Sequence, residues 1–214
     1  DATGLVTAEG LDYTQLVQKF LLGAVTYSQV ARDYFSFGEE GDATFIKAGK
    51  GLTAGNDVAD DTGKPYSTLE HHWDEAFGYF GAPTNAASID ATDAYAIAKG
   101  KKEIFAKADL NGNGKIDLDT EMLYAHAYYA AGADKSGKSN YLNSITQAFI
   151  DGRQIIADAK GEKLNDEQRK QLLEKANFIK TNWELVIAEA AFKYAGSVYS
   201  DALKLQAGIE ANSD

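Results

Sequence analysis

The oxygen-bearing side chains that could hold a cation are concentrated in residues 109–121. Calcium binds about six to eight oxygen ligands, which a short loop supplies from alternate positions together with a backbone carbonyl. In this chain those positions hold carboxylates, amides and a lysine whose carbonyl can contribute: Asp109, Asn111, Asn113, Lys115 and Asp117. Gly114 stands at the sixth position, where such a loop must turn sharply. The spacing predicts a calcium site, and the number of ligands favours calcium over magnesium.

The end of this loop departs from the EF-hand pattern. A glutamate that binds with both oxygens is expected at the twelfth position, but the chain has Thr120 there. Asp119 or Glu121 could supply the carboxylate if the following helix begins in a different phase. An asparagine- and glycine-rich turn without an ion is the alternative. A single loop of this kind is expected to stabilise the fold rather than to signal.

A second group of candidate ligands lies in residues 67–81. Ser67 followed by Glu70 is a typical helix start, and Gly81 is a typical helix end. The apolar positions have helical spacing and predict the buried stripe: Leu69, Trp73, Ala76, Phe77 and Phe80. On a helical projection, His72, Glu75 and Tyr79 fall on one flank of this stripe, whereas His71 and Asp74 point largely away.

Imidazole and carboxylate groups on one helical flank can ligate iron or zinc, and other helices can add ligands. His126, the third histidine of the chain, is the candidate from elsewhere in the sequence, and Tyr79 could contact a ligand. The zinc-protease pattern of two histidines four residues apart is missing, because His71 and His72 are adjacent. The alternative is a histidine at the core edge, with His72 hydrogen-bonded to Glu75 or Tyr79.

Composition excludes several classes of function. A formal net charge of −11 and a pI near 4.7 argue against nucleic acid as a partner. The chain has no cysteine, so thiolate chemistry is excluded. No apolar run is long enough to predict a transmembrane segment. Serine-hydrolase and nucleotide-binding signatures are missing, and the tyrosines at 124, 128 and 129 are interpreted as packing at the core or its edge.

Helical periodicity dominates the chain and predicts an all-α fold. Helices are expected over residues 12–34, 67–80, 87–108 with a break near Gly100, and 119–131. Ser139 or Asn140 should cap another, and Asn165 with Gln168 should begin a long one that bends or breaks near Thr181. Residues 35–66 predict a long loop with one short helix. One domain, 1–214, is expected, and a weak internal similarity leaves open two related halves (about 1–108 and 109–214) or chance.

The segment His71–Gly81, with sequence HHWDEAFGYFG, resembles a family of uncharacterised bacterial domains within the imelysin-like superfamily. Residues 10–17, 114–118 and 181–186 are similar as well. The resemblance implies a helical bundle whose first helices precede residue 1. It also implies export to the periplasm or the outer membrane, and a link to iron uptake. The hallmark Gly-x-His-x-x-Glu carries over as His72 and Glu75, with Glu70 in place of the glycine.

The leading hypothesis is therefore an exported, non-enzymatic helical protein that binds calcium in the loop and a second ion or ligand beside His72 and Glu75. One alternative is an imelysin-type metallopeptidase with Glu75 as general base and His72 as metal ligand. The other is a surface interaction domain in which calcium is purely structural. Protein partners are not predicted by any motif.

Overall fold

The computed structural model describes residues 6–37, 50–59 and 62–211. Its elements are helical, and within these ranges extended pairing is limited to two isolated bridges, Val6–Asp12 and Ala59–Ser67. The all-α prediction is confirmed. In chain order the elements are α1 (Tyr13–Leu21), the π-helical η1 (Leu22–Tyr27) and η2 (Val30–Tyr34), η3 (Gly51–Thr53), α2 (Thr68–Phe80), η4 (Thr84–Ala87), α3 (Ala91–Ala98), η5 (Lys102–Ile104), α4 (Phe105–Ala108), α5 (Ala125–Asp134), α6 (Tyr141–Asp158) and α7 (Asp166–Ala211).

Helix α2 begins and ends where its local sequence predicts. The Ser67 hydroxyl accepts from the Glu70 amide at 3.1 Å, and the Glu70 carboxylate accepts from the Ser67 amide at 2.8 Å. Together these two bonds form a capping box. Gly81 ends the helix with φ +85°, a conformation that glycine adopts without strain. The same reciprocal pair, Asn165 with Gln168, begins α7.

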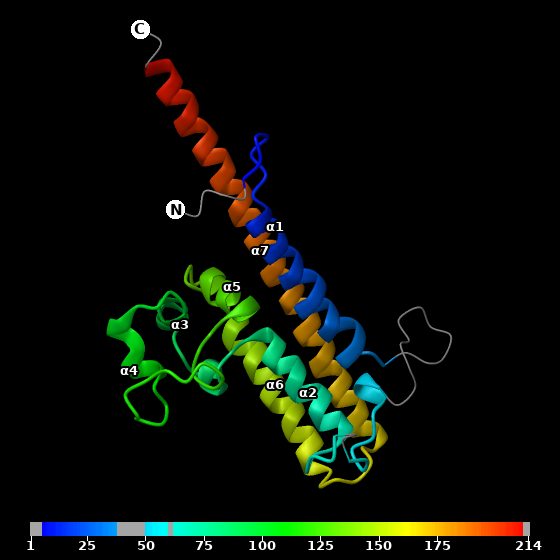
Figure 1. The fold of residues 1–214 in the computed structure, drawn as a ribbon. Helices are drawn as coiled ribbons and strands as arrows, with labels where there is room; N and C mark the ends of the chain where they lie inside the picture. The colour runs from blue at the N-terminus through cyan, green and yellow to red at the C-terminus, as the bar shows by residue number, and fades with distance from the viewer. Residues whose placement is uncertain (1–5, 38–49, 60–61, 212–214) are drawn as a thin grey trace.

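The core lies between α2, α6 and the N-terminal half of α7, which run side by side (Figure 1). The indole of Trp73 in α2 donates to the carbonyl of Phe149 in α6 at 2.9 Å. The Phe149 ring also lies 5.4 Å from that of Phe77 and 6.1 Å from that of Phe80. Trp183 brings α7 into the same aromatic core, 5.0 Å from Phe80.

Two helices and one cap differ from the prediction. Helix α5 begins at Ala125 rather than 119, because the Tyr124 amide donates to the carbonyl of Gly81 at 2.9 Å and holds the chain extended there. Helix α7 continues through Thr181 without a break. The side chain of Asn140 does not cap α6. The first amides of this helix instead donate hydrogen bonds to the carboxylate of Asp134.

Other boundaries follow the prediction more closely. The break near Gly100 is confirmed, since that residue has φ +70° between α3 and η5. Within the predicted loop at 35–66, the short helix η3 is present, while residues 38–49 and 60–61 lie outside the described residues.

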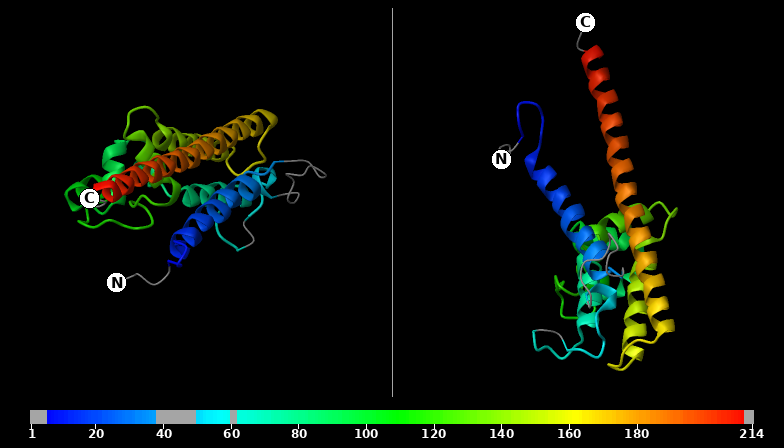
Figure 2. Two further views of the ribbon diagram at one scale, coloured as in Figure 1. Left: turned by 90° about the horizontal axis from the view of Figure 1, so that it is seen from above. Right: turned by 90° about the vertical axis from the view of Figure 1, so that its right-hand side faces the viewer.

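Helix α1 and the C-terminal half of α7 extend beyond the core and diverge from each other (Figure 2). Residues 191–211 of α7 are all exposed, and large apolar side chains are among them, such as Phe192 at 76%. Phe20 of α1 is 68% exposed. No helix in the described part of the chain is both long and apolar enough to cross a membrane.

Candidate functional site

The loop predicted to bind calcium folds around the carboxylate of Asp109. One oxygen of Asp109 accepts from the Asn113 amide at 3.0 Å and the other from the Gly114 amide at 2.8 Å. The side-chain oxygen of Asn113 accepts from the Lys115 amide at 2.8 Å. Gly114 has φ +78°, as a sharp turn at the sixth position requires. The side chains of Asp109 and Asn113 therefore hold the turn of the loop through its backbone amides.

Glu121 closes the loop from the other side, although the calcium pattern places a ligand one residue earlier. Its carboxylate is 2% exposed. One oxygen accepts from the amides of Leu110 at 2.8 Å and Asn111 at 3.2 Å, and the other from the amide of Asp117 at 2.9 Å. Because regular helix begins only at Ala125, the chain can turn the side chain of Glu121 inward.

In the described residues, no three His, Asp or Glu side chains converge as a metal-ligand group. Within the loop this is because the carboxylates face backbone amides and the Asn111 amide nitrogen, which donates to Asp117 at 2.7 Å. The same finding shows that His126 does not lie close enough to His72 and Glu75 to form the predicted second metal site with them.

His72 lies in the core rather than on an open flank. Its ring is 8% exposed, stacks on Tyr34 at 5.6 Å, and has Nδ1 3.3 Å from the Gly51 carbonyl oxygen. Burial lowers the pKa of His72 below its usual value. The imidazole is therefore neutral at physiological pH and packed against η3, the short helix within the predicted loop.

Glu75 pairs with the histidine that was expected to point away. Its carboxylate lies 3.3 Å from Nε2 of His71, one helical turn earlier, and also hydrogen-bonds to Tyr34. Burial and this hydrogen bond raise the pKa of the Tyr34 hydroxyl. The ring of Tyr79 lies 5.8 Å from that of the same Tyr34, tilted by 39°. His72, Glu75 and Tyr79 thus meet around Tyr34, and the expected orientation of His71 is wrong.

His126 belongs to a separate part of the core. It is 4% exposed, with Nδ1 3.3 Å from the Thr26 hydroxyl, and its ring lies 5.4 Å from that of Trp183. Burial lowers its pKa to about 4.

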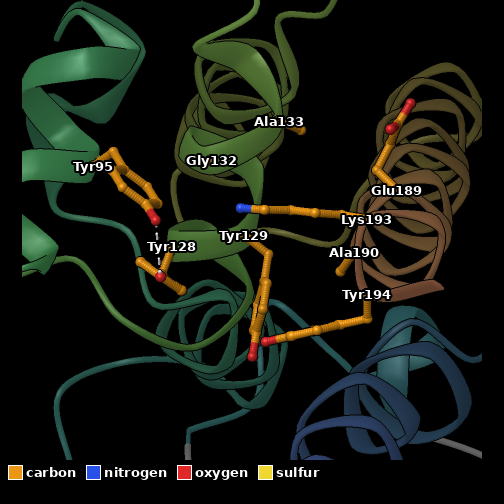
Figure 3. Close-up of a pocket in the computed structure, with 9 residues that line it drawn as sticks. All are labelled: Tyr95, Tyr128, Tyr129, Gly132, Ala133, Glu189, Ala190, Lys193 and Tyr194. Carbon is orange, nitrogen blue, oxygen red and sulfur yellow. Dashed lines mark hydrogen bonds between the residues drawn. The ribbon is translucent and has the colours of Figure 1, made fainter. Parts of the chain in front are cut away.

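A tyrosine pocket between α3, α5 and α7 was not among the predicted sites. Its volume is about 110 Å³, and Figure 3 shows its lining residues. The rings of Tyr95 and Tyr128 stack at 5.1 Å, with their hydroxyl oxygens 3.2 Å apart. Tyr129 and Tyr194 form the opposite wall (Figure 3). We use the name tyrosine pocket for the space between these four side chains.

Lysines surround the tyrosine pocket. The ammonium of Lys135 lies 4.1 Å from the Tyr95 ring centre, and that of Lys99 lies 5.0 Å from the Tyr128 ring centre. Lys193 reaches across the pocket (Figure 3), 6.0 Å from the ring of Tyr95. The sequence shows that Tyr95 and Lys99 are one helical turn apart. It does not predict the pocket, because the lining residues come from helices about a hundred residues apart in the chain.

Comparison with known families identifies the family of the chain, but the description of that family names no activity. The model of a family described as a domain of unknown function, DUF4856, matches residues 1–200. No curated protein and no solved structure matches the chain. Because the family match covers nearly the whole sequence, the chain belongs to the DUF4856 family.

Proposed function

We propose that this chain is a non-enzymatic helical binding domain that holds Ca²⁺ in the loop Asp109–Glu121. The observation that carries the proposal is the buried carboxylate of Glu121, whose oxygens accept from the loop amides of Leu110, Asn111 and Asp117. We assign to it the part of the glutamate expected at the twelfth position. Asn111, Asn113, Asp117 and the carbonyl of Lys115 are the remaining proposed ligands. Oxygen-only ligands in this number favour Ca²⁺ over a transition metal.

The hydrogen bonds within the loop are compatible with a bound cation. A carboxylate offers about four lone-pair positions. Asp109 uses one for each of two amides and Glu121 uses three for backbone amides. Binding would require the amide nitrogen of Asn111 to move off Asp117, since nitrogen of this kind donates and cannot act as a ligand.

The proposed role of the ion is to stabilise the connection between α4 and α5. Glu121 is next to the extended segment that packs on Gly81, so the ion would fix the loop to the end of α2. Glu75, the general base of the peptidase alternative, is engaged by His71 and Tyr34, which favours a non-enzymatic role. Iron or zinc at His72 and Glu75 stays a prediction from the residue types on one helical flank. The imelysin-like relationship, export to the periplasm or cell surface, and a link to iron uptake stay predictions that rest on the resemblance.

Isothermal titration calorimetry tests the proposal. Chelator-treated protein should bind one Ca²⁺ and bind Mg²⁺ more weakly. Glu121→Gln should weaken Ca²⁺ binding by at least about tenfold, since it removes a charged ligand. Asp201→Asn is the matched control, because Asp201 is exposed on α7 and pairs only locally with Lys204 at 2.9 Å. No Ca²⁺ binding, or equal binding by Glu121→Gln, would contradict the proposal.

A further inference from the structure

We propose that the tyrosine pocket and the groove beside it bind an amphiphilic organic anion. The oxyanion head, a carboxylate or a phosphate, would lie against Lys19, Lys193 and the tyrosine hydroxyls. The apolar body would lie along the groove between α1 and α7. This inference does not rest on calcium binding.

The surroundings of the tyrosine pocket are positively charged. Four lysines, Lys19, Lys99, Lys135 and Lys193, lie within 6.0 Å of the centres of the tyrosine rings, in a chain whose net charge is −11. Among the described residues, the ion pairs involve other cations and none of these four. Glu189 is the one acid lining the pocket, and its carboxylate points away from the tyrosines (Figure 3). A cluster of cations without carboxylate partners favours an anionic ligand.

The tyrosine pocket also contains hydrogen-bond donors for an oxyanion. Lys19 donates to the Tyr129 hydroxyl at 2.7 Å, and Tyr129 hydrogen-bonds to Tyr194. The hydrogen bond from Tyr129 lowers the pKa of Tyr194; burial opposes this shift, and the charge of Lys19 adds to it. The hydrogen bond with Tyr128 lowers the pKa of Tyr95; burial again opposes the shift, and the charges of Lys193, Lys99 and Lys135 add to it. A more acidic phenol is a stronger donor to an oxyanion.

The space next to the tyrosine pocket has the size and lining for an apolar body. A hollow of about 480 Å³ lies between α1 and α7, and it shares Tyr129, Ala190 and Tyr194 with the tyrosine pocket. Its other walls are largely apolar and include Leu22 and Ile187. This volume is within the range of small-molecule sites, roughly 300–1,000 Å³. The pocket itself, about 110 Å³, equals only a few water volumes and suits a carboxylate or phosphate head.

Lys19 is the residue that joins the two spaces. It lines the apolar hollow, and its ammonium lies 5.5 Å from the Tyr129 ring centre and 5.6 Å from that of Tyr194. A ligand with its body in the hollow would therefore place its head at this ammonium. The ammonium of Lys19 favours a negatively charged head, and the lining of the hollow favours an apolar body.

Calorimetry with a matched set of ligands tests the inference. Decanoate and decyl phosphate carry the oxyanion head, whereas decyltrimethylammonium and decyl maltoside carry the same tail with a cationic or neutral head. All are used below their micelle concentrations, in chelator, so that failure of calcium binding does not affect the result. At least one of the two anions should bind with one molecule per chain and at least about tenfold more tightly than the cationic and neutral analogues. The stronger of the two anions identifies the head.

Variants locate the bound anion. Lys19→Met and Lys193→Met should each weaken binding of the anion by about tenfold, because each removes a charged donor. Lys175→Met is the control, because Lys175 pairs with Asp151 at 2.6 Å away from the pocket. Circular dichroism checks that the variants are folded. No binding of either anion, equal binding of all four ligands, or unchanged affinity in both lysine variants would overturn the inference.

Discussion

The ammonium of Lys19 lies 2.7 Å from the phenol oxygen of Tyr129, although 110 residues separate them in the chain. The contact fastens α1, whose apolar side chains are largely exposed, to α5 in the body of the protein. A partly buried, charge-assisted hydrogen bond of this kind contributes about 1–3 kcal/mol.

Tyr129→Phe should therefore loosen α1 without unfolding the core. The expected result is faster amide hydrogen exchange across residues 13–21, with unchanged exchange in α6. Tyr124→Phe is the control, since Tyr124 is 44% exposed. Equal protection of α1 in both variants would show that the contact does not hold the helix.

Gly152 allows α6 to approach the indole of Trp73. A methyl group at Gly152 would lie 2.0 Å from a ring carbon of Trp73, which is itself buried. Gly152→Ala should lower the free energy of unfolding by about 1–3 kcal/mol, because the core must shift to admit the methyl group. Gly196→Ala is the matched control in an exposed helix with open space around it, and it should be neutral or stabilising by up to about 1 kcal/mol. Urea denaturation measures both, and equal effects would contradict the packing described.

Asp134, the last residue of α5, caps the N-terminus of α6. Its carboxylate, 6% exposed, accepts from the amides of Tyr141 at 2.8 Å and Leu142 at 2.7 Å and from the hydroxyl of Ser139 at 2.7 Å. Asp134→Ala should destabilise the protein by about 2 kcal/mol, because one buried and one partly buried helix amide lose their acceptor. Thermal denaturation measures both variants. Asp158→Ala, at the exposed end of the same helix, should lower the thermal midpoint by less than half as much as Asp134→Ala does.

The pKa of His126, lowered to about 4 by burial, predicts a pH dependence. The unfolded chain takes up a proton below the usual value of 6.5, whereas the folded chain does so only near pH 4. Stability should therefore fall as the pH falls from about 6.5 to 4, by about 3 kcal/mol in total. NMR titration of the imidazole measures the pKa directly, and His126→Gln should flatten this part of the stability profile. A His126 pKa near 6.5 would contradict the buried environment.

Features encoded by neighbouring residues could be predicted from the sequence. The Ser67–Glu70 and Asn165–Gln168 caps, the turn at Gly81 and the break at Gly100 all depend on residues within a few positions of each other. The turn around Asp109 belongs to this group, since the residues that hydrogen-bond within it follow one another along the chain.

Features assembled by tertiary contacts could not be predicted in this way. The late start of α5 depends on the contact between Tyr124 and Gly81, and the tyrosine pocket joins Tyr95 to residues of α5 and α7. The pairing of Glu75 with His71 could have been predicted, because the two residues are one helical turn apart. The position of His72 against Gly51 depended on a loop whose path the sequence does not reveal.

Anomalous scattering from crystals grown with Ca²⁺ tests the central claim most directly. The account predicts one peak in the loop, about 2.3–2.6 Å from carboxylate oxygens of both Asp109 and Glu121. A loop that contains only water there, with Asn111 still bonded to Asp117, would contradict it.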